Sequence, residues 1–136
     1  MMVRGVTADD LAAIAAIQGA SPAASQWDPA SYLDYDCSVA VSGGRVVGFL
    51  VAREIAAGER EILNLAVDPA ERRRGVARKL LEAELQRAKT QWFLEVRASN
   101  SSALKLYETA GFRTAGRRES YYSNPLETGI VMRFDS

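Results

Sequence analysis

The architecture of this chain follows most directly from residues 63–88, LNLAVDPAERRRGVARKLLEAELQRA. The opening residues are apolar and typical of the end of a buried strand, expected over Arg60–Val67, and Asp68-Pro69 stops it. From Gly75 to Lys89 apolar residues recur at helical spacing, on a stripe made of Val76, Leu80, Leu81, Leu85 and Ala88. The stretch therefore predicts a strand, a turn and an amphipathic helix that packs on a sheet.

Arg72, Arg73 and Arg74 lie in this turn, directly before the predicted helix. The N-terminal end of a helix already carries roughly half a positive charge, so three added cations favour a compensating anion. Gly75 and the small Ala77 leave room for a diphosphate at the free N–H groups of the first turn. The residues alone leave a second interpretation open, a solvated arginine run. Because the segment lacks the Gly-Lys-Ser/Thr ending of a P-loop, it favours a ligand that keeps its phosphates over a phosphoryl donor.

Outward from this stretch, turn and capping signals mark the remaining elements. Thr7 and Asp10 form a capping box before a helix, and Ser42-Gly43-Gly44 is a hairpin turn. Further strands are expected at residues 3–6, 38–41, 45–53, 92–97, 112–117 and 129–134, and further helices at 11–17, 29–35 and 101–110. A connection is expected over Glu119–Thr128. This order predicts an α/β fold, with a mixed, mostly antiparallel central sheet and helices on both faces.

Composition narrows the function. The length of 136 residues suits one domain, residues 1–136. The 17 basic and 17 acidic residues cancel, which gives no support for direct nucleic-acid binding. The chain shows neither a membrane-length apolar run nor a signal-peptide pattern, so we expect a cytoplasmic protein without a membrane partner, and a monomer. The chain has no histidine and one cysteine, which excludes a Ser-His-Asp hydrolase and a histidine or thiolate zinc site, so no metal is expected.

Two polar residues interrupt apolar patterns further along the chain. Glu95 lies in the middle of the strand at 92–97, either as a general base at a cleft or in an ion pair with Arg97 or Arg53 on a solvated face. Tyr107 lies on the helix at 101–110, where the pattern alone favours a core tyrosine with its hydroxyl at the edge. The residues by themselves do not decide between these roles.

The segment from Arg72 to Ala77 resembles the signature of the GNAT superfamily of N-acetyltransferases, Gln/Arg-x-x-Gly-x-Gly/Ala between a strand and a helix. The likeness continues through Trp92–Asn100, through Leu106–Phe112 and through Arg117–Tyr122, where it is similar to the RimI group, bacterial acetyltransferases of ribosomal-protein N-termini. It is close over residues 63–122, whereas the first half of the chain matches only in element order and in Trp27.

The resemblance implies an enzyme that uses acetyl-CoA as cosubstrate, in a GNAT fold whose strands splay apart at the cofactor. It implies backbone contacts from Leu65, Ala66 and Val67 to the pantetheine arm and the acetyl group. The residues implied to bind the pyrophosphate are Arg72, Arg73, Arg74, Gly75, Val76, Ala77 and Arg78. Asn100 would also contact the cofactor, Glu95 would be the general base, and Tyr107 would protonate the leaving thiolate.

The acceptor implied by this likeness is the N-terminal α-amine of a protein or peptide, in particular a ribosomal protein, acetylated by direct transfer in a ternary complex. A lysine or a small amine as acceptor, or a CoA-binding module without turnover, are the alternatives. Tyr121 and Tyr122 either line the acceptor site or pack the last hairpin. Cys37 stands near Asp34 and Asp36, whose charges raise the pKa of a thiol, so a structural cysteine is favoured over an acyl-carrying nucleophile.

Overall fold

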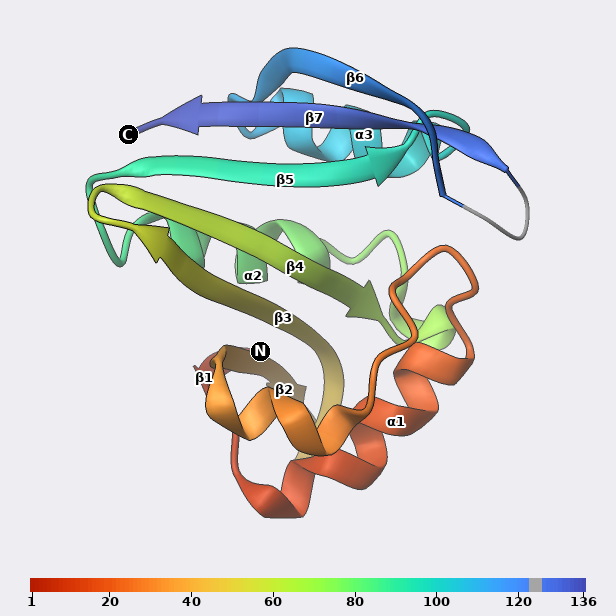
Figure 1. Ribbon diagram of the computed structural model, residues 1–136. Coiled ribbons are helices and arrows are strands. Elements are labelled where there is room, and N and C mark those ends of the chain that lie inside the picture. The colour runs from red at the N-terminus through yellow and green to blue at the C-terminus, as the bar shows by residue number, and fades with distance from the viewer. Residues whose placement is uncertain (123–125) are drawn as a thin grey trace.

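The computed structural model describes residues 1–122 and 126–136, and its elements form one seven-stranded sheet with helices on both faces (Figure 1). The strands are β1 (Met2–Gly5), β2 (Asp36–Ser42), β3 (Arg45–Ala56), β4 (Glu59–Val67), β5 (Gln91–Arg97), β6 (Arg113–Tyr122) and β7 (Glu127–Asp135). The helices are α1 (Leu11–Gly19), α2 (Val76–Leu85) and α3 (Ser101–Thr109), and short 3-10 turns cover η1 (Ala8–Asp10), η2 (Pro29–Asp34) and η3 (Pro69–Glu71).

The strand order is β1-β2-β3-β4-β5-β7-β6, and every neighbouring pair is antiparallel except β4 with β5. The parallel pair is short, because it joins only Glu59, Arg60 and Glu61 to Gln91, Trp92 and Phe93. Beyond these pairs the two strands diverge, as Figure 1 shows. The predicted fold class is confirmed, and so is the splaying of its strands.

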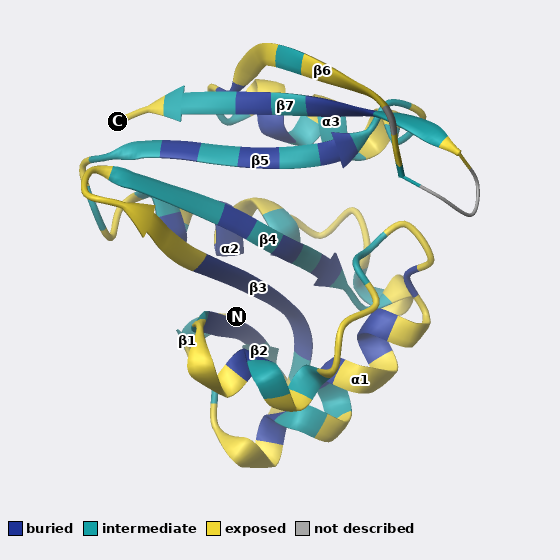
Figure 2. Ribbon diagram, in the orientation of Figure 1, coloured by how far each residue is buried: buried dark blue, intermediate teal, exposed yellow. Residues whose placement is uncertain are grey.

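Each face of the sheet carries its own apolar core. Leu80 and Leu81 of α2 pack with Trp92 and Tyr107 in one core, whereas Ile14 and Tyr32 pack with Phe49 in the other. The central strands contribute alternately to both cores, and for this reason burial is continuous over residues 47–52 of β3, whereas the end of the strand is exposed (Figure 2). The α2 helix lies unusually close to β3 at Gly48, where an added Cβ would stand 2.9 Å from Val76 Cγ1.

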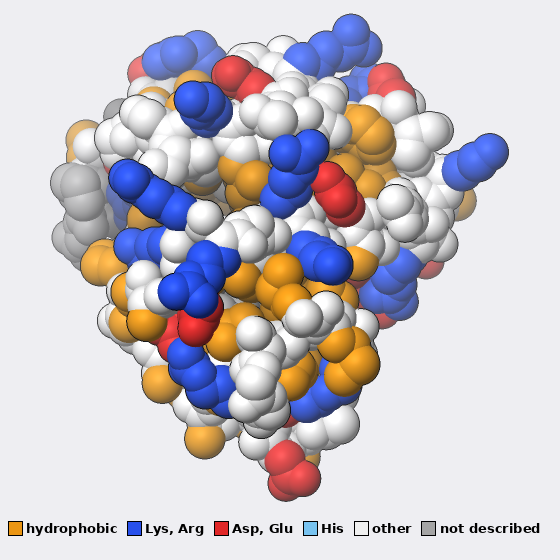
Figure 3. Space-filling model, turned by 180° about the vertical axis from the view of Figure 1, so that it is seen from behind, with side chains coloured by type: hydrophobic (Ala, Val, Ile, Leu, Met, Phe, Trp, Pro, Cys, Tyr) orange, Lys and Arg blue, Asp and Glu red, His pale blue; other side chains and the backbone are white. Residues whose placement is uncertain are grey.

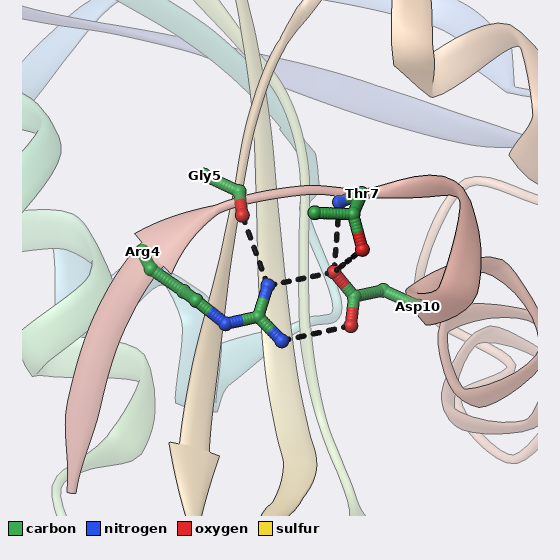
Figure 4. Close-up of polar contacts among 4 residues, drawn as sticks. All are labelled: Arg4, Gly5, Thr7 and Asp10. Atoms are coloured by element: carbon green, nitrogen blue, oxygen red, sulfur yellow. Dashed lines mark hydrogen bonds and ion pairs between the residues drawn. The ribbon is translucent and has the colours of Figure 1, made fainter.

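The N-terminal strand is fixed to the helix that follows it by the predicted capping box. The Asp10 carboxylate accepts the Thr7 N–H at 2.8 Å, and its two oxygens accept hydrogen bonds from both terminal nitrogens of Arg4 at 2.8 and 2.9 Å (Figure 4). The Arg4 guanidinium lowers the pKa of this buried carboxyl to about 2. Asp10 is therefore a buried charge with a complete set of partners.

Several expected boundaries differ from the structure, among them the starts of β1 and β2 and the end of β3. The α2 helix ends at Leu85 rather than Lys89, since the Arg87 N–H turns back to the Glu84 carbonyl, and the chain then leaves to enter β5 beside Gly58. The last two strands are longer than expected because their pairing extends to Tyr122 with Glu127. Of the connection expected over Glu119–Thr128, residues 123–125 lie outside the described part of the chain.

Candidate active site

The divergence of β4 from β5 opens a gap, called the seam below, that runs between Ile62–Val67 and Leu94–Arg97. On its other edge β4 remains paired with β3, with Leu65 opposite Leu50 and Val67 opposite Gly48. Leu65 donates its N–H to the side chain of its own neighbour, Asn64 Oδ1, at 3.1 Å. The β4 backbone at the seam is thus not paired with β5, and its polar groups on this edge have no partner from that strand.

A loop with an unusual backbone leads from β4 to α2. Arg73 has a φ of +64° and Gly75 a φ of +76°, both in the left-handed region, and Arg73 is the sole non-glycine residue with positive φ in the described chain. A left-handed arginine is strained, and such strain concentrates at ligand sites. The first hydrogen bond of α2 runs from Lys79 to the Gly75 carbonyl, so the N–H groups of Val76, Ala77 and Arg78 lack helical partners.

The arginines of this loop are exposed, and most nearby acids are already engaged. Arg45 bridges Asp68 and Glu71, each at 2.9 Å, and Arg74 lies 3.6 Å from Glu71. Among the described residues, Arg72 and Arg73 form no ion pair within 4.0 Å. The helices α2 and α3 lie behind the sheet in Figure 1, and on the face seen from that side Lys and Arg side chains are more frequent than Asp and Glu side chains (Figure 3). Both arginines are therefore free to bind an anion at the start of α2.

Two of the implied cofactor contacts have local partners instead. Arg78 donates to Glu82 at 2.8 Å, one turn further along α2. The Asn100 Oδ1 accepts the Ala103 N–H at 3.2 Å and so caps α3. These two side chains have structural roles in the described contacts, whereas Arg72 and Arg73 do not.

The opposite side of the seam carries Glu95. Its side chain is only 15% exposed, and Oε1 lies 3.1 Å from Arg118 Nε, whereas Oε2 is buried and has no hydrogen-bond partner in the described residues. The sequence predicted an ion pair with Arg97 or Arg53 as the alternative to catalysis, and both partners were wrong. Arg53 pairs with Glu61 at 3.0 Å, and Arg97 lies 3.5 Å from Glu127. A buried carboxylate oxygen without a donor is unusual, because buried polar atoms in proteins are nearly always hydrogen-bonded. A ligand or a water molecule would supply the missing donor.

Two tyrosines have raised pKa values, and the Glu95 carboxylate contributes to one of them. Burial, and next the Glu95 charge, raise the pKa of Tyr122 to about 12. Burial raises the pKa of Tyr107 as well, with a smaller contribution from Tyr122, and its ring packs edge-on against Phe112 at 5.8 Å. Both hydroxyls therefore stay protonated over the neutral range, as a proton donor must. Electrostatic contributions to these pKa values thus link Glu95 to Tyr122 and Tyr122 to Tyr107.

Sequence reasoning missed a buried polar network on the other side of the seam. Gln18 Oε1 accepts the Tyr32 hydroxyl at 2.6 Å, and Asn64 Nδ2 donates to Tyr32 Oη at 3.1 Å and to the Ser25 carbonyl at 3.0 Å. Gln18 Nε2 also donates to the Trp27 carbonyl at 2.6 Å. The network holds the loop after α1 beside β4 (Figure 1). Its signal in the sequence was Asn64, an amide inside an apolar strand.

Other chemistry has little support in the described structure. Burial, followed by the charges of Asp10 and Glu84, raises the pKa of the Cys37 thiol to about 12, which argues against an acyl-carrying nucleophile. Over residues 1–122 and 126–136, no group of three acidic or cysteine side chains is placed to hold a metal ion. Within the same residues, no helix combines the length and apolarity needed to cross a bilayer.

Comparison with known proteins agrees with this geometry. Residues 9–112 match the acetyltransferase (GNAT) family. A ribosomal-protein-alanine N-acetyltransferase of Escherichia coli is 36% identical over 108 residues, which cover 74% of this chain and 70% of that protein. The N-alpha-acetyltransferase RimI of Mycobacterium tuberculosis is 38% identical over 99 residues, covering 70% of this chain and 63% of that protein. The crystal structure of the Escherichia coli ribosomal-protein-alanine enzyme superposes with a TM-score of 0.83 at 29% identity, over 98% of this chain and 92% of that one.

Proposed function

This chain belongs to the GNAT acetyltransferase family and is an acetyl-CoA-dependent N-acetyltransferase, and we propose that it acetylates the N-terminal α-amine of a protein. The observation that carries the proposal is the seam, with the free arginines beyond one side and the buried Glu95 carboxylate on the other. Of the two relatives described above, one is named as a ribosomal-protein-alanine N-acetyltransferase and the other as an N-alpha-acetyltransferase. We extend the proposal to a ribosomal-protein acceptor and to a single-domain monomer acting in the cytoplasm.

The donor is proposed to lie along β4 and the start of α2. Leu65, Ala66 and Val67 would pair through their backbone with the amides of the pantetheine arm, as a neighbouring strand would. The pyrophosphate would lie on the first-turn N–H groups of α2, with Arg72 and Arg73 pairing with its charges. The residues therefore fit acetyl-CoA, which supplies the thioester acyl group. Arg74, Arg78 and Asn100 would have smaller roles in this binding, because their side chains have protein partners.

The transfer is proposed to be direct, within a ternary complex. The acceptor nitrogen bonds to the acetyl carbon, the carbon–sulfur bond breaks, and the excess amine proton passes to Glu95, directly or through one water. An α-amine has a pKa of about 8, so its deprotonation near neutral pH is inexpensive, at about 1.4 kcal/mol per pKa unit. Tyr107 would return a proton to the leaving thiolate from its hydroxyl, which is protonated at neutral pH.

An acetylation assay with matched peptides tests the acceptor. One peptide has a free N-terminus and one lysine, and its control has the same sequence with a blocked N-terminus. We expect acetyl transfer to the first peptide only, at the α-amine, as mapped by mass spectrometry. Equal acetylation of the lysine in both peptides would refute the proposal, and turnover confined to small amines would replace it with the small-molecule alternative.

A further inference from the structure

We infer that Arg118 is a positioning residue that fixes the Glu95 carboxylate and selects which of its oxygens acts on the acceptor amine. The inference rests on the proposed function, in which Glu95 is the base. The contact is between strands that are not neighbours, because β7 separates β5 from β6. Arg118 lies opposite Gly129 of β7, and Glu95 lies opposite Val131, two residues further along the same strand. Residues directly opposite one another share a face of the sheet, so both side chains extend over the same face of β7.

Two tyrosine rings lie over Gly129, the residue opposite Arg118. A Cβ at Gly129 would stand 3.2 Å from Tyr121 Cδ2 and 3.3 Å from Tyr122 Cε2, tighter than ordinary van der Waals contact. The two tyrosine rings therefore occupy the space above the glycine that a side chain would fill. Arg118 extends from this crowded position towards Glu95, with its side chain 56% exposed while that of Glu95 is 15% exposed. The guanidinium thus approaches the carboxylate from the solvent side.

The two oxygens of Glu95 consequently differ. Oε1 is held at 3.1 Å by Arg118 Nε, and Oε2 is buried without a donor. An ion pair of this kind favours one orientation of the carboxylate and leaves Oε2 without a protein partner. Oε2 is therefore the oxygen left to receive the proton from the amine or from an intervening water.

The neighbouring cation, Arg97, has a different set of contacts. It lies 3.5 Å from Glu127 Oε1, and its guanidinium stands 4.4 Å from the centre of the Tyr122 ring. Arg118, in contrast, stands 5.1 Å from the centre of the half-exposed Tyr121 ring as well as beside Glu95. Arg118 thereby connects the base to an aromatic side chain at the surface, where an acceptor peptide would arrive.

Steady-state kinetics of Arg118→Met test this role, with Arg117→Met as the matched control. Arg117 is the adjacent residue of β6, is similarly exposed at 60%, and pairs only with Glu119, at 3.7 Å, among the described residues. We expect Arg118→Met to lower kcat by about tenfold or more, since small misplacements of a catalytic group cost up to about a hundredfold. We expect its KM for acetyl-CoA, its Tm and the kinetics of Arg117→Met to remain at wild-type values, and Arg118→Lys to recover part of kcat.

A double-mutant cycle separates positioning from other effects. If Arg118 acts through Glu95, Arg118→Met changes kcat little in a Glu95→Gln background. An equal loss of kcat in both backgrounds, or a wild-type kcat for Arg118→Met, would overturn the inference. Absence of α-amine acetylation by the wild-type enzyme would instead refute the proposed function, so the two failures are distinguishable.

Discussion

The two sides of the seam are built in different ways. The donor side is continuous in sequence, because β4, the arginine loop and the first turn of α2 span residues 62–78 without interruption. The opposite side is drawn from β5, α3 and β6, which carry Glu95, Tyr107 and Arg118, and an ion pair joins Glu95 to Arg118. The donor side therefore depends on local backbone geometry, and the opposite side depends on strand pairing. We expect substitutions on the first to change cofactor binding and substitutions on the second to change the rate of transfer.

Glu95→Gln should produce the largest effect and should be confined to the rate. Removing a general base typically costs about a hundredfold or more in kcat, and the amide keeps the size of the side chain. Acetyl-CoA affinity should stay at the wild-type value. Kinetics together with titration calorimetry check both expectations, with Glu119→Gln, an exposed acid on β6, as control. A large loss of acetyl-CoA affinity would contradict the division between the two sides.

Substituting Arg72 and Arg73 together by Gln should weaken acetyl-CoA binding and leave the rate of transfer unchanged. We expect the Kd for acetyl-CoA to rise by about thirtyfold and to lose much of its salt dependence, because two charge-assisted contacts disappear. The value of kcat at saturating acetyl-CoA should change little. Arg53→Gln with Arg113→Gln removes two exposed arginines that pair elsewhere, and this control should bind normally. An unchanged Kd in the double variant would favour the solvated arginine run.

Gly48→Ala tests how far the close packing of α2 on β3 contributes to stability and to acetyl-CoA binding. The added methyl would meet Val76 Cγ1 at 2.9 Å and the Ala66 carbonyl oxygen at 3.2 Å. We expect a loss of about 1.5 kcal/mol in the free energy of unfolding, typical of overpacking, together with weaker acetyl-CoA binding because Val76 begins α2. Chemical denaturation measures the first effect. Gly116→Ala, where nothing lies within 4 Å of the added atom, should be neutral for both.

Asp10→Asn lies far from both sides and should affect only stability. The folded-state pKa of Asp10, about 2, is below its unfolded value, so its contribution is present above that unfolded value and is lost as the pH falls towards 2. We expect the wild-type protein to be more stable than Asp10→Asn by about 1 kcal/mol at neutral pH, with the difference shrinking as the pH falls below about 4 and disappearing only below about pH 2. Thermal unfolding across this pH range checks it. A difference that does not shrink between pH 4 and pH 2 would show a cause other than charge.

The sequence predicted the helices, strands and turns of the donor side better than the contacts of the opposite side, because the donor side is continuous in sequence. A capped helix, a turn and an arginine loop are determined by residues that are close together in the sequence. Their positions can therefore be predicted from the sequence. The partner of Glu95 depends on β7 lying between β5 and β6, which no local pattern reveals. The Gln18–Asn64–Tyr32 network likewise joins three elements, and its signal in the sequence is Asn64, a polar residue inside an apolar strand.

The brevity of the β4–β5 ladder also has a consequence for folding. Strands β2, β3 and β4 are consecutive in the chain, adjacent in the sheet and joined by tight turns. The contacts among them therefore have low sequence separation. Strand β5 must instead pair with β7 across an intervening helix and strand, a contact with a larger loop-closure cost. The three paired positions between β4 and β5 are a weak hydrogen-bonded link between these halves. The opening proposed for the cofactor thus coincides with the weakest hydrogen-bonded link between these two parts of the sheet.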